Sequence, residues 1–520
     1  MAKETQIRTN FTTFPIEILN NIFQHLEKDI RTLYSCIQVN RNLCKQVIPY
    51  IWSNPMPNTY SSINIELFIY FFEEKEKKEL RQQYQLDIND SYQPLFNYVS
   101  YLKILDPRGV RRAVFYWLKN YYVEKYPYSD IYVDFKNNQI IDFTEKALLR
   151  LILKNSSKIE KLILDLAEKY QDIPNYSIFN ELQEQQGEGT NHGIREITKL
   201  SIISSSVIQF DNIQGFLYIL PIICRKIQKI KLHDLFLVDQ NMELKLYNII
   251  REQKNLTSIN LAYNFVNILR SISSLKYHAA SLKKLVLKYI YHNDRDLLNT
   301  FDQLINLEYL EIKECFPIKI ILEPLIRANL KLVTLKINDN ESRYDLIESI
   351  IKSSGSTLKQ LELNIFIDMI ENRSTLSKLC PNLTYLHLKI NNRVICDDND
   401  KGEKHSIFFN YINNLVYLKY FYMEFYLIYM IGDFDQLINL SSLQFVSLKD
   451  HHYSLDSLKK WFDYFTTIFN NITFYIDNGL EDFHKNVLED FAQEKKDDGF
   501  NLVYTLDGFY KFVAKNQILY

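Results

Sequence analysis

The sequence predicts an α/β fold in which strand–helix repeats stack one after another behind a small helical module. Three observations support this prediction. A short apolar pattern recurs at near-constant spacing, the segments between its copies carry apolar residues at helical spacing, and the first 55 residues contain short helical patterns instead. In a fold of stacked repeats, each repeat buries its apolar face against its neighbours.

The N-terminal segment holds three short amphipathic helices. Pro15 suits the first turn of the first helix, where its missing N–H costs nothing. Three helices in about 40 residues make a small core with apolar surface to spare, and such a module usually needs a partner. The apolar stripes of the three helices are Ile18, Leu19, Ile22, Phe23 and Leu26; Leu33, Cys36, Ile37 and Val39; and Leu43, Val47, Ile48 and Ile51, ending at Trp52.

The recurring pattern is an apolar residue, two others, an apolar residue, one other and a third apolar residue. From Ile159 onward its copies start 38, 30, 29, 26, 25, 25, 26, 25, 35 and 25 residues apart, and five successive near-equal steps are not expected by chance. The period fits a leucine-rich repeat, whose second and third apolar positions lie on one strand and point into a shared core. A weaker first copy is Val99-Leu102-Ile104.

Two polar insertions, at 181–195 and 391–406, interrupt the array and are predicted to be surface loops. After Leu448 the pattern degrades, and 472–476 and 502–504 are predicted to be the last, irregular strands. An atypical final repeat is expected where the array needs a cap. The charged run 73–81 alternates in sign at helical spacing and predicts an exposed, salt-bridged helix between the module and the repeats.

Composition excludes several function classes. The chain has 61 Lys+Arg against 63 Asp+Glu, a net charge of −2, so no global field attracts nucleic acid or anionic membrane. Only 11 glycines in 520 residues argue against folds built on glycine-rich nucleotide loops. The apolar stretch 212–224 is too short to span a bilayer and contains Pro221. We therefore expect no nucleic-acid or membrane partner.

No motif indicates a cofactor, a metal or catalysis. The six cysteines form no CxxC pair, and no apolar leader resembles a signal peptide, so we expect an intracellular protein with reduced thiols. The glycines at 187, 189 and 193 lack the strand that a phosphate loop needs. His451-His452 has no third ligand at useful spacing. The basic run 108–112 is predicted to be a solvated face.

The concave face of the predicted sheet is the candidate binding surface. Alternate strand residues point to opposite faces, so those flanking the middle apolar position face outward. Early repeats present lysines and late ones aromatics, which fits an acidic or phosphorylated segment with an apolar anchor. The general richness of the chain in Tyr and Lys is the alternative explanation. The candidate target-binding residues are Lys199, Lys229, Lys231, Tyr309, Tyr385, His387, Tyr420, Tyr422 and Phe445, with Lys161 at the start of the row.

Residues 11–53 resemble an F-box. The similarity lies in Phe14-Pro15-Ile16-Glu17-Ile18-Leu19, Ile22-Phe23 and Leu26, then in Val39-Asn40-Arg41 and the closing Trp52. Phe14 stands where the family usually has Leu, and Asn42-Leu43-Cys44 lacks a Trp found in many members. The resemblance implies docking on a Skp-type adaptor through Phe14, Pro15, Ile18, Leu19, Ile22, Phe23 and Leu26.

The expected architecture is an F-box at 11–53, a helical linker region at 54–98 and a leucine-rich-repeat domain at 99–520, in which a horseshoe carries its parallel sheet on the concave face and helices on the convex face. The resemblance implies a non-catalytic substrate-recognition subunit of an SCF-type cullin-RING ubiquitin ligase, with an unidentified target protein. The alternative is a leucine-rich-repeat scaffold outside any ligase.

Overall fold

The computed structural model describes residues 14–27, 29–55, 65–88, 93–125, 139–156, 158–165, 193–203, 211–234, 240–262, 269–291, 299–338, 343–366, 375–391, 411–412, 414–426, 445–449, 473–476, 500–504 and 510–514. The chain divides into two compact units, residues 1–256 and 257–520. Both are mixed α/β structures built on parallel strands.

The first unit begins with three helices, and local side chains fix the starts of the second and the third. Asp29 accepts a hydrogen bond from the backbone N–H of Thr32 at 3.1 Å. Asn40 accepts one from the N–H of Leu43 at 2.9 Å. Both satisfy N–H groups that the first turn of a helix leaves without a partner. The three helices are α1 (Ile16–His25), α2 (Ile30–Ile37) and α3 (Arg41–Ile51).

These helices share a core of their own, as the apolar spacing predicts. Phe14, Leu26, Cys36, Ile37, Tyr50 and Trp52 pack around it. Val39 is an exception: it follows the end of α2 and is 64% exposed, so its predicted place in the second stripe is wrong. The buried core residues are Leu19, Phe23, Leu33, Leu43, Val47 and Ile51.

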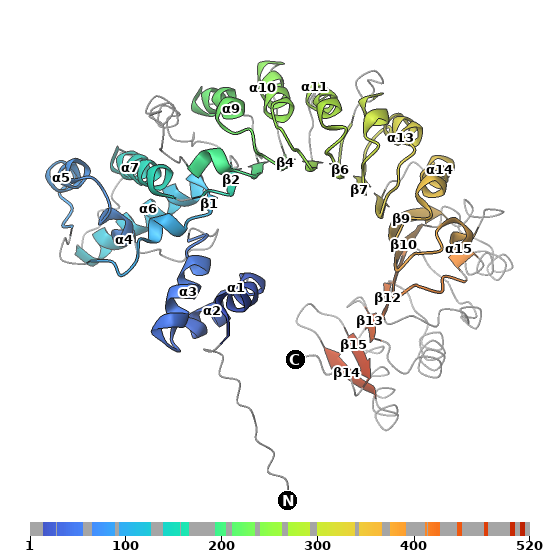
Figure 1. Cartoon of the computed structure of the whole chain (residues 1–520), viewed down its shortest axis with the longest axis horizontal. Coiled ribbons are helices and arrows are strands. Elements are labelled where there is room, and N and C mark those ends of the chain that lie inside the picture. The colour runs from blue at the N-terminus through green and yellow to red at the C-terminus, as the bar shows by residue number, and fades with distance from the viewer. Residues whose placement is uncertain are drawn as a thin grey trace, which may run out of the picture. The chain divides into compact units, whose positions relative to one another are not determined.

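The rest of the first unit alternates strands with helices. The helices α9 (Asp211–Ile223) and α10 (Gln240–Arg251) pack together beside β4 (Lys229–His233) (Figure 1). The elements are α4 (Glu66–Ile69), α5 (Glu74–Gln82), the 3₁₀ turn η2 (Tyr98–Tyr101), β1 (Ile104–Leu105), α6 (Pro107–Lys125), α7 (Gln139–Asn155), β2 (Lys161–Asp165), η3 (Gly193–Glu196), β3 (Lys199–Ile203), α9 (Asp211–Ile223), β4 (Lys229–His233) and α10 (Gln240–Arg251).

Strands β1 to β4 are parallel, and the repeat pattern predicts the register of β2 to β4. Leu162, Leu200 and Ile230 are paired in adjacent strands and buried. The first copy of the pattern is different, because Leu105 pairs with Leu162. The predicted copy Val99-Leu102-Ile104 is therefore displaced by three residues. The two-residue strand β1 is too short for the pattern to show its register.

A repeated backbone contact joins each repeat of the first unit to the next. One carbonyl oxygen in each repeat, which in three of the four cases belongs to the residue just before a strand, accepts hydrogen bonds from two consecutive N–H groups of the following repeat. The acceptors are the carbonyls of Ser53, Lys103, Glu160 and Thr198. The row thus starts directly after α3, before the first strand.

The second unit continues the alternation with shorter connections. Helices α13 and α14 pack together on one side of β7 to β9 (Figure 1). Its elements are β5 (Ser258–Ala262), α11 (Leu269–Ser273), η4 (Ser274–His278), β6 (Lys284–Lys288), η5 (Asn299–Gln303), β7 (Tyr309–Lys313), α13 (Ile318–Arg327), β8 (Thr334–Asn338), α14 (Tyr344–Ser354), β9 (Gln360–Phe366), α15 (Leu376–Leu379), β10 (Tyr385–Asn391), β11 (Tyr420–Tyr426), β12 (Phe445–Lys449), β13 (Thr473–Ile476), β14 (Phe500–Tyr504) and β15 (Tyr510–Ala514).

The predicted shared core of the second unit is confirmed. Strands β5 to β13 run parallel in sequence order. The middle apolar residues of five successive strands are paired in register and fully buried: Leu285, Leu310, Leu335, Leu361 and Leu386. Between β6 and β7 the described residues form a 3₁₀ turn, η5; residues 292–298 of this connection lie outside the described part of the chain, so the expectation of a helix there stays a prediction.

The end of the array departs from the repeat, as expected of a cap. The predicted strands near 472–476 and 502–504 are present as β13 and β14. Strand β15 pairs antiparallel with both of them. The predicted loops at 181–195 and 391–406 lie almost wholly outside the described residues, and so do His451 and His452. Within the described chain, no helix has the length and apolarity needed to cross a membrane.

Candidate protein-binding surfaces

The seven candidate adaptor-binding residues divide into two groups. Leu19 and Phe23 are buried in the core of the three helices. Phe14, Ile22 and Leu26 are half-buried, and Phe14 and Leu26 pack against that core. Pro15 and Ile18 are exposed, with Ile18 at 45%. The two exposed residues are free to contact another protein without disturbing the module.

Further apolar residues of the module are exposed next to these. Ile16 lies on α1, Ile30 and Tyr34 lie one turn apart on α2, and Val39 lies in the turn that follows. The spacing of Ile30 and Tyr34 on one helical face was available from the sequence. The apolar stripe that the sequence predicts for this helix runs through Leu33 and does not include these two residues. Exposed apolar side chains of this number on a small module are typical of a protein-binding surface.

The module is fastened to the first strand of its unit. The carbonyl of Ser53 accepts hydrogen bonds from the N–H groups of Lys103, at 2.9 Å, and Ile104, at 3.1 Å. The ring of Trp52 lies 4.3 Å from that of Tyr98, measured between centroids. These contacts hold the end of α3 against the start of the sheet.

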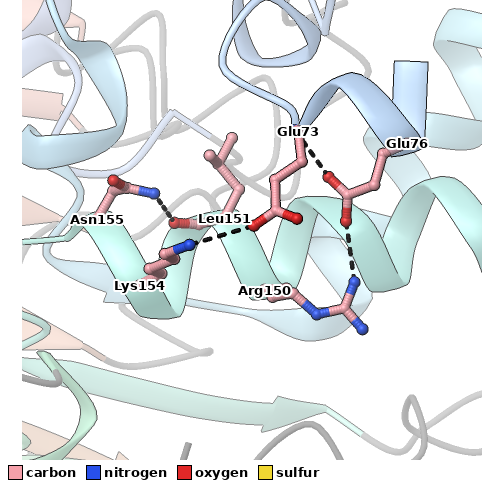
Figure 2. A network of polar contacts seen from close by, with 6 residues as sticks. All are labelled: Glu73, Glu76, Arg150, Leu151, Lys154 and Asn155. Carbon is pink, nitrogen blue, oxygen red and sulfur yellow. Dashed lines mark hydrogen bonds and ion pairs between the residues drawn. The ribbon is translucent and has the colours of Figure 1, made fainter. Parts of the chain in front are cut away.

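A second connection runs through the charged helix α5. Arg150 on α7 pairs with Glu76 at 2.9 Å, and Lys154 pairs with Glu73 at 3.1 Å (Figure 2). Glu76 also accepts a hydrogen bond from the backbone N–H of Glu73. The predicted exposed helix is therefore docked on α7 along one side, with Glu76 buried. The sequence pattern showed charges within the helix but not their distant partners.

The basic run 108–112 is also different from the predicted solvated face. Arg111 contacts both Asp142 and Glu145 of α7, each at 2.6 Å. Arg108 pairs with Asp165 at 2.6 Å. Burial raises the pKa of Glu145 to about 7, and the charge of Arg111 opposes that shift without cancelling it. These arginines join helices and strands within the protein.

The face of each sheet that the helices leave uncovered is called here its open face. In the first unit this face carries a row of lysines. Lys161, Lys199 and Lys229 are paired in register on β2, β3 and β4, and Lys231 follows two residues further on. The pKa of Lys161 is lowered mainly by burial, and further by the positive charges of Lys231 and Lys199. Three of the four were predicted to bind the target, and Lys161 begins the predicted row.

The open face of the second unit carries a polar network around Tyr309. The Tyr309 hydroxyl donates a hydrogen bond to Glu311 at 2.7 Å, and Lys284 lies 3.6 Å from the centre of its ring. Lys288 pairs with the same carboxylate at 2.5 Å. Burial raises the pKa of Glu311, but hydrogen bonds from Lys288 and Tyr309 outweigh it, and the pKa lies below its ordinary value. Tyr309 is thus already engaged within the face.

The other predicted aromatic residues come together three and four strands further along, on β10 and β11. Tyr422 lies 5.1 Å from Tyr385 and 5.7 Å from His387 between ring centroids. The Nδ1 atom of His387 lies 3.7 Å from Glu362, which also pairs with Lys336 at 2.9 Å. Tyr420, on the same strand as Tyr422, is 43% exposed.

Phe445 is placed by the backbone alone. It pairs in register with Tyr420 on the neighbouring strand, as the repeat spacing predicts. The sheet therefore continues the row that holds Tyr385 and Tyr420.

The described residues contain no cluster of side chains suited to bind a metal ion. No group of three His, Cys, Asp or Glu side chains in that part of the chain is arranged to hold a metal ion. Burial raises the pKa of Cys380 to about 12 and that of Cys224 further, so both thiols are small core groups.

Comparison with known proteins adds no assignment. A scan of the sequence against protein-family models found no matching family, and a search of curated proteins found no match. The fold itself defines the class of protein: an α/β protein whose parallel strands come from stacked repeats.

Proposed function

We propose that this protein is the substrate-recognition subunit of an SCF-type cullin-RING ubiquitin ligase. In this proposal the three N-terminal helices are an F-box that docks a Skp-type adaptor, and the leucine-rich repeats bind the target. The protein itself performs no bond chemistry, because ubiquitin transfer belongs to the other subunits.

One observation supports the adaptor half most directly. The three helices complete a core of six residues and still leave Ile16, Ile18, Ile30, Tyr34 and Val39 on the outside. A fully buried side chain of this size stabilises a complex by roughly 1.5–3 kcal/mol. Several such residues against one adaptor are enough for a stable complex.

The decisive variant is Ile18→Asp. Ile18 is exposed, so its replacement should leave the module folded and abolish capture of a purified Skp-type adaptor. Gln24→Asp, another exposed change on α1, is the matched control and should retain capture. Leu19→Asp also abolishes capture, but by unfolding the module, since Leu19 is 1% exposed. Circular dichroism separates the two causes.

Full adaptor capture by Ile18→Asp would place the docking surface elsewhere. If the wild-type chain captures no adaptor at all, the ligase assignment is wrong, and a scaffold of repeats outside the ligase takes its place.

The target half of the proposal rests on the open faces. In the second unit, Tyr420 and Tyr422 are the proposed aromatic anchors, since exposed aromatics carry much of the energy of protein interfaces. For a target identified by proximity labelling, Tyr420→Ala should weaken binding more than Lys389→Ala on β10. Equal effects, or loss only from changes in the helices, would reject this anchor.

A further inference from the structure

The lysine row of the first unit is an unneutralised cluster of positive charge. Lys199, Lys229 and Lys231 are exposed, and none of these three or Lys161 makes an ion pair within the described part of the chain. Adjacent strands lie about 4.8 Å apart, so charges in register repel one another at close range. This repulsion lowers the pKa of Lys161 in addition to burial. The cluster therefore does not stabilise the fold.

Three acids lie near the row, and two of them face arginines; the charge of one of these, Asp106, also acts on Lys161. Asp165, at the end of β2, pairs with Arg108 at 2.6 Å. Asp106 is buried and lies 3.8 Å from Arg112. Asp234, just after β4, is close enough to feel the charge of Lys231, which opposes the effect of burial on the Asp234 pKa. The two form no ion pair among the described residues.

The second unit provides an internal comparison. On its open face, Lys336 pairs with Glu362 and Lys288 pairs with Glu311, while Lys284 lies over the ring of Tyr309. At the third strand position, Lys336 is thus neutralised by an ion pair while Lys231 makes none within the described residues, and at the first position Lys284 lies over an aromatic ring while Lys161, Lys199 and Lys229 face one another. A general abundance of lysine does not explain this difference, because it would supply both faces alike.

We infer that the open face of β2 to β4 binds a clustered anionic segment of a target protein, with at least two carboxylates or phosphates within about four consecutive residues. Lys161, Lys199 and Lys229 span two strand spacings, about 10 Å, which an extended chain covers in about three residues. The inference rests on the target-binding half of the proposed function and is independent of the adaptor.

The test uses the full chain and fluorescein-labelled peptides in an anisotropy titration. Peptides of equal length and charge carry their glutamates in one run or dispersed, and a third carries phosphoserines in place of the run. The clustered peptide should bind roughly tenfold tighter than the dispersed one, and added salt should reduce this difference. Because each phosphate carries a charge of about −2, the phosphoserine peptide holds half as many anionic residues, and at this equal charge the ranking of the two clustered peptides tells which group the face prefers.

Charge reversal locates the site. Lys199→Glu combined with Lys229→Glu should weaken the clustered peptide roughly tenfold or more. Lys119→Glu combined with Lys254→Glu changes the net charge equally at exposed positions outside the strands and should stay within about twofold. Lys199→Gln combined with Lys229→Gln removes the charges without reversing them and should cause an intermediate loss of affinity. This variant keeps the test valid if the charge-reversed variant misfolds.

Four results would overturn the inference: no binding of either clustered peptide, equal binding of clustered and dispersed peptides, equal losses in the two charge-reversal variants, or tighter binding of an oligonucleotide of equal charge. None of them bears on adaptor capture, which Ile18→Asp tests separately.

Discussion

The carbonyl oxygen of Leu379 lies so close to Gly355 that a Cβ atom added there would overlap it. Gly355 follows the last residue of α14, and Leu379 is the last residue of α15, so the two helix ends meet backbone to backbone. The φ angle of Gly355 is −55°, which any residue can adopt. The missing side chain, and not backbone freedom, is what the position requires.

Gly355→Ala should therefore destabilise the second unit, although alanine favours helices. Overpacking a close contact of this kind costs about 1–3 kcal/mol. The measurement is the midpoint of urea unfolding, and exposed Ser356→Ala next to it should be near neutral. An unchanged midpoint for Gly355→Ala would show that the two helix ends separate at little cost.

Alternation along β9 predicts opposite outcomes at neighbouring positions. Leu361 is fully buried in the shared core, and Leu361→Ala should cost about 2–5 kcal/mol. Gln360 precedes it on the exposed face and accepts a hydrogen bond from the Thr334 hydroxyl at 3.3 Å, so Gln360→Ala should lower the unfolding free energy by about 1 kcal/mol or less. Similar losses at both positions would contradict the strand register.

The two ion pairs between α5 and α7 should differ in strength. The Glu76 side chain is 11% exposed, so Arg150→Met leaves a buried carboxylate without its partner and should cost about 1–3 kcal/mol. Lys154 and Glu73 are 59% and 60% exposed, and Lys154→Met should cost about 0–1 kcal/mol. Chemical unfolding of both variants measures the difference. A larger loss from Lys154→Met would mean that burial does not govern these pairs.

Glu145 predicts a pH dependence of stability. Burial raises its pKa from 4.5 in the unfolded chain to about 7 in the folded one, against the opposing charge of Arg111, while Asp142 adds to the rise. The folded state then binds the proton more tightly, so this contribution is present below pH 4.5 and is lost as the pH rises through 7. Glu145→Gln lacks the titrating group and serves as the control.

The measurement compares thermal unfolding of the wild type and Glu145→Gln between pH 5 and pH 8. The stability of the wild type relative to the variant should fall as the pH rises, because the variant resembles the protonated form. A constant difference across this range would show that Arg111 keeps Glu145 ionised throughout.

The strands and their register were predictable because they depend on local spacing. The burial of Leu310 and Leu335 follows from a period of two within the strand and a repeat of 25 residues. The predicted register is wrong at Leu105, because this strand is only two residues long and shows no alternation of apolar and polar residues.

The charged contacts were not predictable from spacing alone. The partner of Arg150 is Glu76, 74 positions away, and that of Lys336 is Glu362 on the next strand. Which lysines of the open faces are neutralised depends on such distant pairs. The different burial of Ile18 and Leu19 was not predictable either. The two residues are adjacent in sequence, but the packing of the three helices leaves Ile18 on the surface and buries Leu19 in the core.

The carbonyl of Ser53, just after the N-terminal helices, makes the same pair of backbone hydrogen bonds that joins one repeat to the next. Backbone hydrogen bonds thus join the N-terminal helices directly to the structure that carries the lysine row. Under the proposed function, the first unit works as a spacer of fixed length: it would hold a bound target at a set distance and orientation from the adaptor. Which lysines of the target receive ubiquitin would then be decided by geometry as well as by affinity.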